Sequence, residues 1–151
     1  MRRAKWGSRA LVVLGFNIYD AKLWTQDDFS VADYPRKSFA LELNYLRNFS
    51  GGSIAERSLK EMRKQSTISD ELAKQWLDQM RQIFPDVKKG DQLVGIHRAD
   101  GSSSFVLNGK PIGEVRDAQF GRLFFGIWLG QQTSEPKMRR ELIGAANPAR
   151  S

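Results

Sequence analysis

The sequence predicts an α+β fold in which helices pack on one face of an antiparallel sheet. Two turn dipeptides, Asp100-Gly101 and Asn108-Gly109, separate three strand-like segments. Directly after these segments, apolar residues recur at the intervals of one helix face, over residues 120–128. Along the whole chain, strands precede a helix pair, and further strands precede further helices, an order that is typical of α+β domains.

Five strands are expected. Asn108 and Gly109 both tolerate the positive φ that a type I′ turn requires, so the segments on either side of them should pair as a hairpin. With the Asp100-Gly101 turn, the last three strands then form an antiparallel meander. The expected strands are residues 9–24 with a bend near Gly15, 37–47, 91–98, 102–107 and 110–115.

Two helices are expected in the middle of the chain, after the break at residues 49–52. Ser53-Ile54-Ala55-Glu56 has the capping-box pattern that starts the first. Thr67-Ile68-Ser69-Asp70 starts the second, and Pro85 ends it. The second helix carries a wide apolar stripe, made of Leu72, Ala73, Trp76, Leu77, Met80, Ile83 and Phe84.

Two more helices are expected at the C-terminal end. Asp117 is placed as the N-cap of the first, and Gly130 as its C′ residue. A last short helix begins near Ser134-Glu135-Pro136, with proline in its first turn. The first of these helices has one apolar face, formed by Phe120, Leu123, Phe124, Ile127 and Trp128.

Size and composition predict one folded domain over residues 1–151. A chain of 151 residues and 17.2 kDa can bury a single core without disulfides or metals. Cysteine is absent, which excludes thiol chemistry and leaves the redox compartment open. No apolar segment approaches the length of a membrane span.

The N-terminus mimics a signal peptide, because basic residues at positions 2–5 precede an apolar run at residues 10–16. No small-x-small cleavage site follows this run, and a core strand explains it. We therefore interpret it as part of the fold.

The net charge of +7 raises the question of nucleic-acid binding. Arg57, Lys60, Arg63 and Lys64 form a basic cluster on one expected helix, but acidic residues interrupt it. No helix-turn-helix, RNP or zinc-finger spacing is present. We interpret the charge as a solvated basic surface and do not expect nucleic acid as a partner.

Metal and cofactor chemistry has little support in the sequence. There is one histidine and no cysteine, and no carboxylates stand at metal-ligand spacing, so we expect no metal site and no cofactor. His97 ends an expected strand, and we interpret it as a partly exposed strand residue rather than a general base. The four tryptophans fit either core filling or the lining of an apolar pocket.

Several short motifs carry a family resemblance through their order and spacing. They are Tyr19-Asp20-Ala21-Lys22-Leu23-Trp24, residues 40–47, Lys88-Lys89-Gly90-Asp91, Leu107-Asn108-Gly109, Ile127-Trp128-Leu129-Gly130 and Leu142-Ile143-Gly144. Over roughly residues 7–144 the chain resembles the bacterial chalcone isomerase-like family. The resemblance implies an open-faced sandwich of a sheet against helices.

The resemblance also bears on the start of the chain and on its location. Members of this family usually begin further upstream, with a signal peptide and an opening strand. It therefore implies that the N-terminus is trimmed and that the protein is periplasmic. Without such a leader the protein would be cytoplasmic.

The resemblance points to Arg9 and Tyr19 as ligand-binding residues. In the plant isomerases and the related fatty-acid-binding proteins, an arginine on this early strand contacts the anionic group of the ligand, and a nearby hydroxyl assists it. A guanidinium offers a bidentate fork to a carboxylate, and a phenol adds one donor. The alternative is that Arg9 is one more surface arginine of a basic N-terminus.

Two departures from the family pattern argue against chalcone isomerase activity. No tyrosine is found around residues 68–75, and Ile127 stands where an isomerase has a serine or threonine. The loss of several polar groups that orient one substrate should abolish specific cyclisation.

Three hypotheses remain. The first is a non-catalytic protein that binds a small hydrophobic carboxylate, such as a fatty acid, between sheet and helices. The second is an isomerase or lyase of unknown substrate that uses Arg9 and Tyr19. The third is a structural partner at an envelope or nucleic-acid surface, suggested by the charge alone.

Overall fold

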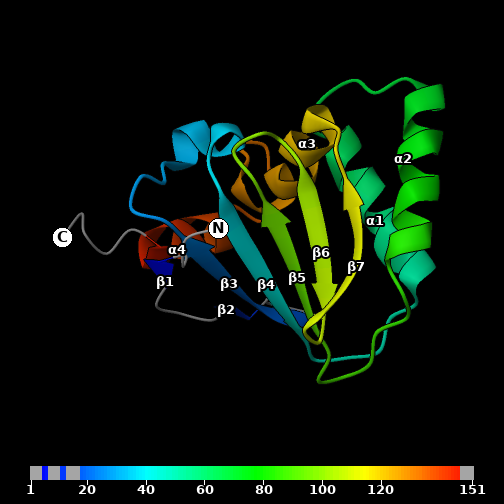
Figure 1. Cartoon of the computed structure of the whole chain (residues 1–151), viewed down its shortest axis with the longest axis horizontal. Coiled ribbons are helices and arrows are strands. Elements are labelled where there is room, and N and C mark those ends of the chain that lie inside the picture. Colours follow the sequence, from blue (N-terminus) through cyan, green and yellow to red (C-terminus); the bar gives the residue numbers. More distant parts are fainter. Residues whose placement is uncertain (1–4, 7–10, 13–17, 147–151) are drawn as a thin grey trace.

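The computed structural model describes residues 5–6, 11–12 and 18–146 and shows a twisted antiparallel sheet (Figure 1). In the described residues the sheet has seven strands, in the order β1-β3-β4-β5-β6-β7, with β2 also paired to β3. All the strand pairs are antiparallel. The strands are β1 Lys5–Trp6, β2 Leu11–Val12, β3 Tyr19–Thr25, β4 Phe39–Tyr45, β5 Gln92–His97, β6 Ser103–Leu107 and β7 Lys110–Val115.

Within residues 18–146, four α-helices and a short 3-10 helix accompany the sheet (Figure 1). The helices are η1 Val31–Arg36, α1 Gly51–Arg63, α2 Asp70–Ile83, α3 Ala118–Leu129 and α4 Pro136–Ala146. The predicted fold class, an α+β fold with helices packed on an antiparallel sheet, is confirmed. In the described part of the chain, no helix is long and apolar enough to cross a membrane.

The first expected strand, residues 9–24, is wrong as a single element. Leu11 pairs with Ala21 and Val12 with Asp20 in antiparallel register. Two segments that pair antiparallel cannot belong to one continuous strand, so β2 and β3 are separate. Buried and partly exposed residues alternate along β3, but such an alternation does not reveal where the chain reverses before it.

The start of α1 also differs from the prediction. The N-cap is Ser50, whose Oγ accepts a hydrogen bond of 3.0 Å from the backbone N–H of Ser53. The helix therefore begins at Gly51, two residues before the expected capping box. Gly51 is enclosed, and a Cβ there would collide with the backbone carbonyl of Phe84.

The C-terminal meander follows the sequence prediction closely. Asn108 and Gly109 have φ angles of 50° and 84°, the left-handed pair that a type I′ turn needs. Asp117 caps α3 as expected, accepting from the N–H groups of Gln119 and Phe120. Gly130 ends α3 at φ −74°, so it is not the left-handed C′ residue that we expected. A side chain is excluded at this position for a steric reason, because a Cβ on Gly130 would lie 2.8 Å from the carbonyl oxygen of Gly126.

Helix α3 forms the centre of the core. It is apolar on most of its circumference, which is typical of a helix enclosed by other elements. Two polar side chains from outside the helix donate hydrogen bonds to backbone carbonyl groups of α3. Tyr34 of η1 donates a hydrogen bond of 2.7 Å to the carbonyl oxygen of Arg122, and Gln65 donates one of 2.8 Å to that of Leu123. Against the sheet, the ring of Phe125 packs where Gly95 of β5 leaves room.

Candidate functional site

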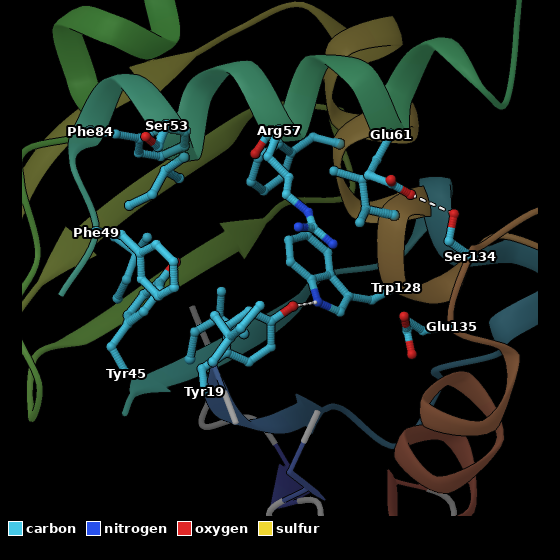
Figure 2. A pocket seen from close by; sticks show the side chains of 17 residues that line it. Tyr19, Tyr45, Phe49, Ser53, Arg57, Glu61, Phe84, Trp128, Ser134 and Glu135 are labelled. Atoms are coloured by element: carbon cyan, nitrogen blue, oxygen red, sulfur yellow. Dashed lines mark hydrogen bonds between the residues drawn. The ribbon is translucent and has the colours of Figure 1, made fainter. Parts of the chain in front are cut away.

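A cavity of about 330 Å³ lies between the sheet and the helices α1 and α3 (Figure 2). Strands β3, β4 and β5 form its floor, and α1 covers it. Its volume is at the lower end of the range for small-molecule sites. The sheet and α3 contribute mostly apolar and aromatic lining residues: Ile18, Tyr19, Leu43, Tyr45, Leu93, Phe124, Ile127 and Trp128.

The wall formed by α1 is more polar. Ser53, Arg57 and Glu61 line the cavity at four-residue intervals, and Ser58 lies three residues before Glu61, so the four share one side of the helix. A ligand in this cavity would meet charged and hydroxyl groups on the α1 side and aromatic rings on the sheet side. Such an arrangement fits an amphipathic molecule.

Tyr19, one of the two predicted ligand-binding residues, lines this cavity. It is the first residue of β3, and its Oη lies 2.8 Å from Nε1 of Trp128 (Figure 2). An indole N–H can only donate, so Tyr19 accepts this bond and keeps its own hydroxyl hydrogen for another partner. Burial raises the pKa of Tyr19 to about 12, although the bond from Trp128 and the charge of Arg57 oppose the shift. Tyr19 therefore stays protonated and is a hydrogen-bond donor at neutral pH.

Arg9, the other predicted residue, lies outside the described residues. Its role as an anion-binding residue stays a prediction.

Arg57 supplies a cation at the cavity that the sequence prediction did not assign. Its side chain extends from α1 toward the hydrogen-bonded pair of Tyr19 and Trp128 (Figure 2). Within the described part of the chain it makes no hydrogen bond or ion pair. Its positive charge still acts on both Tyr19 and Glu61, where it favours the ionised forms. An arginine in this position is available to a carboxylate.

The sequence did contain a signal for Arg57. Ser53, Arg57 and Glu61 stand at four-residue intervals, which places them on one helix face. The sequence interpretation instead groups Arg57 with Lys60, Arg63 and Lys64 in a solvated basic surface. The sequence shows that these residues share a helix face, but the packing of α1 on the sheet decides that this face is turned toward the cavity.

Two hydroxyl groups line the cavity without a partner. Tyr45 is 5% exposed and Ser58 is 8% exposed. Neither hydroxyl forms a hydrogen bond with any residue that the structure describes. Burial raises the pKa of Tyr45 above the ordinary value of 10.0, so its phenol is neutral.

Polar contacts at the mouth of the cavity join α1 to the segment before α4. Ser134 Oγ donates a hydrogen bond of 2.7 Å to Glu61, and Lys64 Nζ lies 3.0 Å from the same carboxylate. Burial alone would raise the pKa of Glu61, but the hydrogen bonds from Ser134 and Lys64 outweigh it, and the pKa is lowered. The ionised Glu61 thus holds Ser134 at the rim of the cavity.

His97 is not at this site, and its predicted partial exposure is wrong. It is 1% exposed and stacks on Phe39 at a ring distance of 5.0 Å. Its Nδ1 lies 2.8 Å from the carbonyl oxygen of Lys37, which assigns the ring hydrogen to Nδ1. His97 is the last residue of β5, and it is buried because α3 covers this end of the strand. Among the described residues, no three His, Asp or Glu side chains are grouped as a metal site would need.

The chain shares its fold with a plant protein of known structure. A fatty-acid binding protein of Arabidopsis thaliana superposes with a TM-score of 0.66, covering 99% of this chain and 90% of that protein, at 12% sequence identity. At this identity the similarity demonstrates the fold alone. It agrees with the sheet and helix arrangement described above.

Sequence comparison gives a relative and a family. An uncharacterized protein of Haemophilus influenzae is 27% identical over 129 residues, which is 85% of this chain but 62% of that protein. This chain therefore spans less than two thirds of the length of that relative. The model of the chalcone isomerase-like family matches residues 7–144, and the chain belongs to this family.

Proposed function

We propose that this protein binds a small hydrophobic carboxylate, such as a medium-chain fatty acid, without transforming it. The observation that carries the proposal is the cavity itself, in which an arginine with no partner among the described residues and a buried phenol donor stand beside a wall of aromatic and aliphatic side chains. The fold similarity to a fatty-acid binding protein supports the same class of ligand.

The apolar wall would hold the tail of the ligand. The cavity of about 330 Å³ lies at the lower end of the range for small-molecule sites, which suits a tail of medium length. Burial of about eight methylene groups supplies about 6 kcal/mol at about 0.8 kcal/mol for each group. A medium-chain tail thus accounts for much of a micromolar affinity, whose total free energy is about 8 kcal/mol.

The polar side would hold the head group. In this proposal the carboxylate accepts hydrogen bonds from the guanidinium of Arg57 and from the hydroxyl of Tyr19. Arg9, the arginine that the family resemblance indicates, is a second candidate for the same contact. Charge-assisted hydrogen bonds of this kind fix orientation and add affinity to the burial of the tail.

A binding role also agrees with the state of Tyr19. The alternative, an isomerase or lyase, would use this phenol as an acid. A general acid works best when its pKa lies near the working pH. The pKa of Tyr19 is about 12, two units above its ordinary value of 10.0. This shift favours hydrogen-bond donation over proton transfer.

The proposal is tested by thermal shift and native mass spectrometry on protein from which lipid has been removed. Decanoic acid should raise the melting temperature and appear as a one-to-one complex. Decan-1-ol has a similar tail but no charge and should have a weaker effect. A panel of saturated acids that produces neither a shift nor a complex would overturn the proposal.

Matched variants then test the head-group contact. Arg57→Gln should weaken decanoic acid binding about tenfold, the scale of one charge-assisted hydrogen bond. Lys60→Gln removes the same charge from the same helix at a residue that does not line the cavity, and should leave binding unchanged. Equal losses in both variants would indicate a general effect of charge, and Arg9→Gln would then be the decisive variant.

A further inference from the structure

We propose that the ligand carries a second oxygen on its chain, a hydroxyl or oxo group close to the carboxylate, and that Tyr45 and Ser58 bind it. This inference rests on the proposed function, because it concerns the same cavity and specifies the class of acid further. A 3-hydroxy or 3-oxo medium-chain acid has the required chemistry.

The three tyrosines of the chain show why Tyr45 is unusual. The hydroxyl of Tyr34 donates to the carbonyl oxygen of Arg122, and that of Tyr19 accepts from Trp128. The hydroxyl of Tyr34 is thus satisfied as a donor, and that of Tyr19 has one partner inside the protein while its hydrogen stays available to the carboxylate. Tyr45 is 5% exposed, yet its hydroxyl has no partner among the described residues and its side chain lines the cavity.

Ser58 presents a second hydroxyl to the same space from the opposite wall. A serine inside a helix can satisfy its hydroxyl by bonding to a carbonyl of the preceding turn. Ser58 makes no such bond, nor any other with the described residues. Because Ser58 lines the cavity, we expect its hydroxyl to donate to a bound ligand there. Residues of two elements, β4 and α1, thus bring a hydroxyl each to the lining of one cavity.

A plain alkyl tail would leave these two hydroxyls unsatisfied. An empty cavity can hold water against them, but a saturated chain displaces that water and offers nothing in return. A ligand oxygen that replaces the water restores the hydrogen bonds. Sites built to bond a substrate oxygen discriminate strongly against the analogue that lacks it.

The strand register places the second oxygen near the head group. Tyr45 is the direct cross-strand partner of Tyr19, and their ring centroids are 5.7 Å apart. On α1, Ser58 directly follows Arg57. Each proposed oxygen-binding residue is therefore adjacent to a proposed carboxylate-binding residue. An oxygen within the first few carbons of the chain suits this spacing, and an oxygen at the far end does not.

Calorimetric titration with three acids tests the inference. The probes are decanoic acid, 3-hydroxydecanoic acid and 10-hydroxydecanoic acid, which share one chain length. The protein without lipid should bind 3-hydroxydecanoic acid about tenfold more tightly than decanoic acid, a difference of about 1.4 kcal/mol. The terminal hydroxyl of 10-hydroxydecanoic acid should bring no gain.

Variants assign the effect to the two hydroxyls. Tyr45→Phe should reduce the preference for 3-hydroxydecanoic acid over decanoic acid to within about twofold, and the ratio of the two affinities measured on the same variant is the readout. Ser58→Ala should reduce it in part and provides a second variant if Tyr45→Phe folds poorly. Tyr34→Phe removes a buried hydroxyl outside the cavity and should keep the full preference.

The outcomes separate this inference from the proposed function. Binding of decanoic acid without any preference for the 3-hydroxy acid, or a preference that both cavity variants retain, overturns the inference alone. Failure of all three acids to bind overturns the proposed function and the inference with it.

Discussion

Single residues decide what the cavity can bind. Tyr19 was predicted from the family resemblance, and it lies in the cavity with its hydroxyl hydrogen available. Arg57, Tyr45 and Ser58 were not predicted as site residues. An arginine, a tyrosine and a serine are common in any sequence. What distinguishes these three is that none has a hydrogen-bond partner among the residues that the structure describes. No sequence pattern reports that absence.

Tyr19→Phe should affect both stability and binding. The variant leaves the indole N–H of Trp128 without an acceptor, which should lower the free energy of unfolding by about 1–2 kcal/mol. It also removes a donor to the carboxylate, so decanoic acid should bind several-fold more weakly. Chemical denaturation and calorimetry measure the two effects. Tyr34→Phe is the control, since it should lose stability but keep binding. Unchanged affinity in Tyr19→Phe would exclude Tyr19 as a carboxylate ligand.

His97 should make the protein less stable in mild acid. Burial lowers the pKa of His97 below its ordinary value of 6.5, and the backbone bond to Lys37 and the charge of Asp100 only partly compensate. The unfolded chain therefore binds a proton more readily than the folded chain. The stability from neutral His97 is fully present above pH 6.5 and is lost as the pH falls from there through the folded-state pKa.

Urea denaturation at several pH values measures this effect. The free energy of unfolding should fall between about pH 7 and about pH 5, a range that lies above the titration of ordinary carboxyl groups. A His97→Gln variant, although less stable overall, should show a flatter profile over that range. An equally steep profile in the variant would assign the effect to other groups.

At the scale of elements, local signals predicted most of the structure. The Asn108-Gly109 turn and the Asp117 cap act through residues adjacent in sequence, and both are present as predicted. The errors arise where distant contacts decide. The start of α1 depends on the approach of Phe84 to Gly51, and the separation of β2 from β3 depends on strand pairing.

The two glycines at the start of α1 should respond in opposite ways to alanine. A Cβ at Gly51 would collide with the carbonyl of Phe84, whereas a Cβ at Gly52 would meet nothing within 4 Å. Gly51→Ala should therefore destabilise the protein by more than about 2 kcal/mol, on the scale of overpacked sites. Gly52→Ala should be neutral or stabilise it by up to about 1 kcal/mol through helix propensity. Thermal melting of the pair checks this, and similar melting temperatures would contradict the packing of α1 against Phe84.

At the scale of the whole molecule, the cavity is a consequence of how α1 and α3 are spaced on the sheet. The sequence predicted the sheet, the helices and an apolar interior, but it could not distinguish core filling from pocket lining. Trp76 is 1% exposed and packs in the core, whereas Trp128 lines the cavity. Both lie on apolar helix faces, and only the separation of the packed elements assigns them different roles.

The size of the cavity predicts a limit to chain length. Affinity should rise by about 0.8 kcal/mol with each added methylene while the tail still fits. A chain that is longer than the cavity must emerge into solvent or expand the site, so the gain should stop there. Calorimetry with saturated acids of six to sixteen carbons, in steps of two, checks this. A continued rise through the longest acids would show that the cavity does not enclose the tail.

The most direct test of the binding account is a crystal structure of the protein with decanoic acid. The account predicts a tail between the sheet and the helices α1 and α3, in contact with Phe124, and a carboxylate within hydrogen-bonding distance of Arg57 and Tyr19. A ligand in the reverse orientation, with its carboxylate away from both residues, would contradict the assignment of the head-group site. An empty cavity at saturating ligand would contradict the account as a whole.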